Sequence, residues 1–120
     1  MKKTITILLL ILTLSCEEII NEQNISNDMI SLLAPTENAV LTTSTKISYN
    51  WEVLSGATNY QLQIANPDFN NANQLVIDTL LTNTSFTLDS LSQNTYQWRI
   101  KGSNSIFETA YTTINFIVEP

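Results

Sequence analysis

The chain contains no histidine, one cysteine and only two glycines in 120 residues. Without histidine it cannot build a Ser-His-Asp triad or a histidine-rich zinc site, and a single cysteine cannot form an internal disulfide. Basic residues are also few, five against eleven acids. The resulting net charge of −6 argues against nucleic-acid binding, because holding phosphates requires a basic surface. Asparagine must take many turn positions that glycine would otherwise occupy.

The scattered acids predict no catalytic site. No two of them stand at a spacing typical of paired acid/base work, and without histidine the chain has no ordinary proton carrier at neutral pH. Serines and threonines are plentiful but have no base partner, and no Gly-rich phosphate loop occurs. We therefore expect no catalytic residue, no cofactor and no metal site, and we expect that the protein is not an enzyme.

The first sixteen residues predict a secretory leader. Lys2 and Lys3 precede the apolar run ITILLLILTL at residues 5–14, and Ser15 and Cys16 follow it. A basic start, about ten apolar residues and a small residue at the break are typical of a signal peptide. The run is shorter than the ~20 residues that a bilayer span needs. The alternative, a buried helix of the fold, would leave the two lysines unexplained.

The end of this run, LTLSC at residues 12–16, resembles the lipobox of bacterial lipoproteins. In that family a peptidase cuts just before the cysteine, and the cysteine sulfur carries diacylglycerol. The resemblance implies a signal peptide over residues 1–15 and a lipidated Cys16 that holds the protein on a membrane. Two or more acyl chains give stable anchoring, with each buried methylene contributing ~0.8 kcal/mol. A free structural or reactive Cys16 is the alternative.

Residues 16–28 are predicted to form the lipidated cysteine and a flexible tether. The stretch EEIINEQNISND carries four acids and no base, and such segments bury too little apolar surface to order themselves. Glu17 and Glu18 directly after the cysteine resemble an export signal of Bacteroidetes surface lipoproteins. That resemblance implies a cell-envelope protein of the outer membrane that is exposed at the cell surface. A plain acidic spacer is the alternative.

From residue 29 to residue 120 the pattern predicts one all-β domain. Short apolar runs recur every ten residues or so between Asn, Thr, Ser and Gly, which is typical of a sandwich or barrel. Tyr96 and Trp98 alternate with polar residues in the clearest run, as do Trp51 and Val53 in another, and this period of two marks half-buried strands. The seven expected strands cover residues 30–33, 45–53, 59–65, 74–80, 84–88, 95–101 and 110–118.

Seven short strands in this length match an immunoglobulin-type sandwich of ~100 residues. The sequence resembles fibronectin type III domains, in the form common in bacterial surface lipoproteins. The resemblance rests on LAP at residues 33–35, Trp51, GATNY at residues 56–60 and YQWRI at residues 96–100. It implies a seven-stranded Ig-like β-sandwich and a tyrosine corner, in which a phenol bonds to the backbone a few residues upstream. The expected core residues are Trp51, Tyr60, Tyr96 and Trp98.

Two short motifs suggest a modification. Asp78-Thr79-Leu80 and Asp89-Ser90-Leu91 resemble the O-glycosylation site of Bacteroidetes envelope proteins, which implies glycans on Thr79 and Ser90. Ordinary turn residues are the alternative.

Three aromatic residues are predicted to lie in or beside loops: Phe69, Phe107 and Tyr111. Aromatic rings near loop tips can stack on sugars or contact a protein partner, although they can also simply cover the ends of a sandwich. We expect a non-enzymatic, lipid-anchored envelope protein with one interaction or structural module, whose partner is an envelope protein or a glycan. The alternative is a glycan- or ligand-binding accessory lipoprotein of a surface uptake system.

Overall fold

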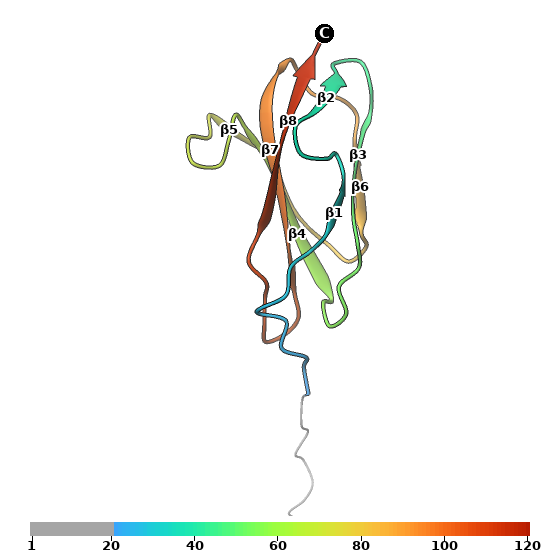
Figure 1. The fold of residues 1–120 in the computed structure, drawn as a ribbon, viewed down its shortest axis with the longest axis vertical. Helices are drawn as coiled ribbons and strands as arrows, with labels where there is room; N and C mark the ends of the chain where they lie inside the picture. Colours follow the sequence, from blue (N-terminus) through green and yellow to red (C-terminus); the bar gives the residue numbers. More distant parts are fainter. Residues whose placement is uncertain (1–20) are drawn as a thin grey trace, which may run out of the picture.

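The computed structural model describes residues 21–120, which form two facing β-sheets (Figure 1). The smaller sheet has the order β1-β3-β6, and the larger has the order β2-β8-β7-β4-β5. The predicted all-β sandwich is confirmed. No helix that could cross a membrane occurs in this part of the chain. The strands are β1 (Leu32–Ala34), β2 (Ala39–Thr42), β3 (Ile47–Trp51), β4 (Asn59–Asn66), β5 (Gln74–Leu81), β6 (Ser85–Leu88), β7 (Asn94–Ser103) and β8 (Thr112–Glu119).

Alternate side chains of both sheets meet in one aromatic core. The ring of Trp51 lies 6.3 Å from that of Trp98 and 5.9 Å from that of Tyr60. The rings of Tyr96 and Phe116 stack at 5.4 Å. Separations of this size are favourable for aromatic pairs. The four residues expected in the core are each at most 2% exposed, so the alternation identified the inward faces correctly.

Two side chains of β7 tie the connections between the sheets to this core. The Tyr96 phenol donates a 2.7 Å hydrogen bond to the carbonyl of Ser92, four residues upstream, which is the predicted tyrosine corner. The indole Nε1 of Trp98 donates a 3.1 Å bond to the carbonyl of Pro35, in the crossing from β1 to β2. The same strand therefore fixes two crossovers.

The structure differs from the sequence prediction in one additional strand and in the orientation of one side chain. Residues 39–42 form β2, which pairs in parallel with β8, Ala39 lying opposite Phe116. This four-residue run has too few positions to show an alternation. Val53 was predicted to point inward but is 75% exposed, because β3 ends at Trp51 and the chain then turns toward β4.

The sandwich has two distinct ends. The N-terminal pole holds residues 22–28 and the connections at 52–58, 82–84 and 104–111, because β3, β5 and β7 end there and β4, β6 and β8 begin there. The C-terminal pole holds the connections at 43–46 and 89–93 and the end of the chain. Figure 1 shows the N-terminal segment and the C-terminus at these opposite ends.

The segment expected to be a flexible tether lies against the N-terminal pole from Glu22 on. Ile25 is 0% exposed. The side-chain amide of Asn104 donates 2.9 Å bonds to the carbonyls of both Gln23 and Gly56. Gly56 has φ +93°, and a Cβ on it would lie 2.9 Å from Cγ2 of Ile25. Only glycine adopts this backbone readily and leaves room for the segment.

The prediction of a flexible tether through Asp28 is therefore wrong for the described residues. Burial of the Ile25 side chain and the bonds from Asn104 offset the entropy lost on ordering the segment. The expected signal peptide (residues 1–15), the lipidated Cys16 and the acidic pair Glu17 and Glu18 lie outside the described residues.

Candidate functional site

The outward face of the larger sheet carries a cluster of aromatic and cationic side chains. The guanidinium of Arg99 lies between two rings, 3.9 Å from the centroid of Phe69 and 4.1 Å from that of Tyr111. Its Nε donates a 2.8 Å bond to Oε1 of Gln63. The Lys101 ammonium lies 5.0 Å from the Tyr111 ring. Cations over ring faces at such distances are attracted by the ring quadrupole, so Arg99 links both sides of this face.

Two of the three aromatic candidates therefore meet, and the third does not. Phe69 and Tyr111 both contact Arg99. Phe107 lies at the N-terminal pole in a tight turn, where its N–H donates a 2.8 Å bond to Oδ1 of Asn104. Contact of any of the three with a partner stays a prediction, but Phe69 and Tyr111 already have a structural role.

The loop between β4 and β5 is fixed to this face. The N–H of Phe69 donates a 2.9 Å bond to Oε1 of Gln97 on β7. Within the loop, Oδ1 of Asp68 accepts a 2.7 Å bond from the N–H of Asn71, a local turn that aspartate favours. The sequence predicted a loop here but gave no reason for it to be ordered.

A row of side-chain hydrogen bonds crosses the sheet beneath this loop. Nε2 of Gln97 donates a 2.9 Å bond to Oδ1 of Asn115 on β8. Nδ2 of Asn115 donates a 2.9 Å bond to Glu37, and its N–H donates one of 3.0 Å. These two donors from Asn115 stabilise the carboxylate and lower the pKa of Glu37. The row holds the outward amides in fixed positions.

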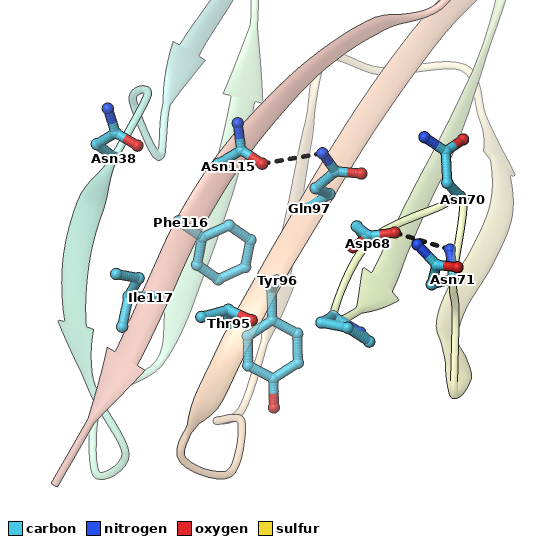
Figure 2. A pocket seen from close by; sticks show the side chains of 11 residues that line it. Asn38, Asp68, Asn70, Asn71, Thr95, Tyr96, Gln97, Asn115, Phe116 and Ile117 are labelled. Carbon is cyan, nitrogen blue, oxygen red and sulfur yellow. Dashed lines mark hydrogen bonds between the residues drawn. The ribbon is translucent and has the colours of Figure 1, made fainter.

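Beside this row, the loop and the sheet enclose a polar hollow of about 380 Å³ (Figure 2). Its floor is formed by outward residues of β7 and β8, one wall by the loop from Pro67 to Asn71, and the opposite side by Asn38. A second hollow of about 360 Å³ adjoins it toward the C-terminal pole and shares Thr95 and Ile117 with it. We call the two together the flank trough. The trough is lined by Asn38, Pro67, Asp68, Asn70, Asn71, Gln93, Asn94, Thr95, Tyr96, Gln97, Asn115, Phe116, Ile117, Val118 and Glu119.

The flank trough was not predicted from the sequence. The one signal for it was the loop NPDFNNAN at residues 66–73, whose density of amides exceeds what a turn requires. Residues 21–120 hold no group of three or more histidine, cysteine, aspartate or glutamate side chains that could bind one metal ion. Carboxamides of Asn and Gln make up nearly half of the trough's lining, and such groups both donate and accept hydrogen bonds.

The two proposed glycosylation sites differ in their surroundings. Ser90 is exposed in the connection between β6 and β7. Thr79 is half-buried on β5 and lies opposite the buried Leu62. Modification of either residue stays a prediction, and Ser90 is the more accessible of the two.

No protein-family model and no curated protein sequence matches the chain. Among solved structures, the fibronectin(III)-like modules of Clostridium thermocellum CbhA align with 76% of this chain and 96% of their own, with a TM-score of 0.52 and 13% identity. The chain has a fibronectin type III-like fold. The solved structure of FN3tt aligns with 75% of this chain and 95% of its own, with a TM-score of 0.53 and 10% identity.

At these identities the likeness concerns the fibronectin type III-like fold alone. It confirms the fold that the motifs at residues 33–35, 56–60 and 96–100 implied. The site on the outward face of the larger sheet comes from this chain's own side chains.

Replacing Phe69 with alanine is expected to loosen the loop that walls the trough. The contact of its ring with Arg99 is worth about 1 kcal/mol, so its loss corresponds to about fivefold faster opening of residues 67–72. Hydrogen exchange of the loop amides measures this rate. Ile106→Ala, at a side chain that is 58% exposed, is the control. Unchanged exchange in Phe69→Ala would contradict a role of the ring in holding the loop.

Proposed function

We propose that the protein is a non-enzymatic, lipid-anchored envelope protein whose fibronectin type III-like module serves in interaction. The observation that carries the proposal is the ordered polar face of the larger sheet, where Gln63, Gln97, Arg99 and Asn115 are held by side-chain contacts. Side chains ordered in advance lose little freedom when a partner binds. Carboxamides dominate this face, and they suit recognition rather than proton transfer.

The proposed anchor is a diacylglycerol on Cys16, with the mature protein in the outer membrane and exposed at the cell surface. The leader-like run that ends at Cys16 supports the lipid, and the acidic pair Glu17 and Glu18 supports the export. The described domain follows these residues directly, since Glu22 already contacts it: Oε1 of Glu22 accepts a 3.0 Å bond from the N–H of Ser105 and one from its hydroxyl.

Replacing Cys16 with alanine is expected to abolish lipid attachment. In cells fed an alkyne fatty acid, the natural chain should carry the label and collect in the outer-membrane fraction, because acyl chains hold it there. Cys16→Ala should carry no label and leave that fraction. Ser15→Ala, which keeps a small residue before the cysteine, should behave like the natural chain.

Two results would contradict these parts of the proposal. A Cys16→Ala protein that still takes up the label, or still collects in the outer membrane, would overturn the lipid anchor. Protease added to intact cells should digest the natural protein while an inner-compartment protein survives. Full protection of the domain would place it inside the envelope and overturn surface exposure.

A second function, a ligand-binding accessory of a surface uptake system, is favoured by one observation. The flank trough is a concave polar surface of the kind that holds a ligand.

A further inference from the structure

We propose that the flank trough binds a neutral oligosaccharide, with one sugar unit in each of its two hollows. The inference rests on the proposed function, because it names the partner class of the same outward face. Four features of the trough support this proposal: the hydrogen-bonding groups of its lining, its ordered backbone, the apolar part of its floor and its charge.

The lining offers both hydrogen-bond donors and acceptors. Asn38, Asn70 and Asn71 are exposed at the walls of the first hollow, and Figure 2 shows their amides around its rim. Gln93 and Asn94 line the second hollow. A carboxamide presents two N–H donors and one carbonyl acceptor, and a hydroxyl also donates and accepts. A surface rich in amides therefore matches a ligand rich in hydroxyls.

The backbone that carries the amides of the first hollow is held in place before any ligand arrives. Asn38 has φ +64°, and its N–H donates a 2.8 Å bond to the carbonyl of Asn115. On the other wall, Asp68 closes the loop by accepting from the N–H of Asn71, and Phe69 fixes it to Arg99. A rigid rim reduces the entropy cost of binding.

The floor is partly apolar. Ile117, which lines both hollows, is 37% exposed. Val40, its neighbour across the β2–β8 pairing, lies beside the lining and is 60% exposed. Pro67 adds an aliphatic ring on the loop side. A sugar ring has a C–H face as well as its hydroxyl edge, and covering exposed aliphatic surface with that face is favourable. The aliphatic part of the floor and the amides of the rim thus match the two parts of a sugar unit.

The charge of the trough disfavours other polar ligands. Among the described residues, its lining holds the carboxylates of Asp68 and Glu119 but no lysine or arginine. Arg99 lies on the same sheet face, but its charge is engaged by two rings and Gln63. An anionic ligand would meet repulsion. A cationic ligand would use the carboxylates and leave the amide donors without a role.

The dimensions favour a chain of sugar units over a single compact ligand. The two hollows measure about 380 and 360 Å³, each at the lower end of the ~300–1,000 Å³ typical of ligand sites. They lie side by side because both are lined by Thr95 and Ile117. A linear glycan can place neighbouring units in both.

The test is an NMR titration of the mature lipidated chain, held in a detergent without a sugar headgroup. The probes are four neutral tetrasaccharides: cellotetraose, maltotetraose, mannotetraose and xylotetraose. At least one should shift the amide signals of residues 67–71, 94–97 and 115–118. Tetragalacturonate and tetralysine, which are anionic and cationic, should bind at least tenfold more weakly.

The discriminating variant is Asn38→Gly combined with Asn70→Ala. Glycine keeps the positive φ of position 38 without strain, so the double variant removes two rim amides and preserves the backbone. We expect its affinity to fall at least tenfold. Asn83→Ala, at an exposed position of the N-terminal pole, is the matched control and should leave affinity unchanged.

The inference is overturned if none of the four neutral probes binds or if the shifts fall outside the trough. It is also overturned if the double variant loses less than tenfold in affinity, or if either charged probe binds within tenfold of the best neutral probe. Its failure is separable from failure of the proposed function. Fatty-acid labelling at Cys16 does not depend on the trough, and sugar binding does not depend on the lipid.

Discussion

Trp51→Ala should give a barely folded protein. The Trp51 side chain is 2% exposed and contacts the rings of Tyr60 and Trp98 across the two sheets. Truncating a buried tryptophan costs about 3–5 kcal/mol, because transfer free energy is lost and a cavity remains. A domain of this size holds only about 5–10 kcal/mol in total. The variant should therefore lose most of its free energy of unfolding.

Thermal unfolding followed by circular dichroism measures this loss. The matched control is Val53→Ala, two positions further along the chain, where the side chain is 75% exposed and truncation should change little. If Trp51→Ala melts cooperatively within a few degrees of the natural protein, then Trp51 is not central to the core.

Ile25→Ala should destabilise the domain by about 2–4 kcal/mol, the cost typical of truncating a fully buried isoleucine. Ile25 is 0% exposed, and it lies over Gly56 in a space that a Cβ there would fill. Asn104 bonds the carbonyls of Gln23 and Gly56 on either side. The segment and the pole should therefore unfold together.

Urea unfolding of the full chain tests this coupling. Met29→Ala is the control, because that side chain directly follows the segment and is 68% exposed. An unfolding midpoint for Ile25→Ala equal to that of the control would mean that the segment adds no stability. The stretch would then behave as the flexible tether that its composition suggested.

Local alternation carried most of the fold prediction. The faces of the strands around Trp51 and Trp98 follow directly from a period of two, since successive side chains of a strand point to opposite sides. The tyrosine corner was implied by the family resemblance, and its bond spans only four residues, from Tyr96 to Ser92. Features that depend on neighbours close in sequence were thus accessible.

Features that depend on residues far apart in the sequence could not be predicted. Ile25 is buried because Gly56 and Asn104, far along the chain, form a space for it. An acidic stretch with isolated isoleucines carries no local signal that predicts this burial. The flank trough likewise needs the loop after β4 to lie over β7 and β8. Asn38, Asn70 and Gln97 line one hollow only because three separate parts of the chain meet there.

The docked N-terminal segment limits how far the flank trough can stand above the membrane. With acyl chains on Cys16, only residues 17–21 separate the lipid from Glu22, and six peptide steps span about 22 Å at most. β7 runs from Ser103 at that pole up to Thr95 in the trough, eight residues at ~3.3 Å each, or about 26 Å. The trough would then stand no more than about 48 Å above the bilayer and open sideways. A protein with this limited reach would meet molecules that lie along the cell surface rather than those far above it.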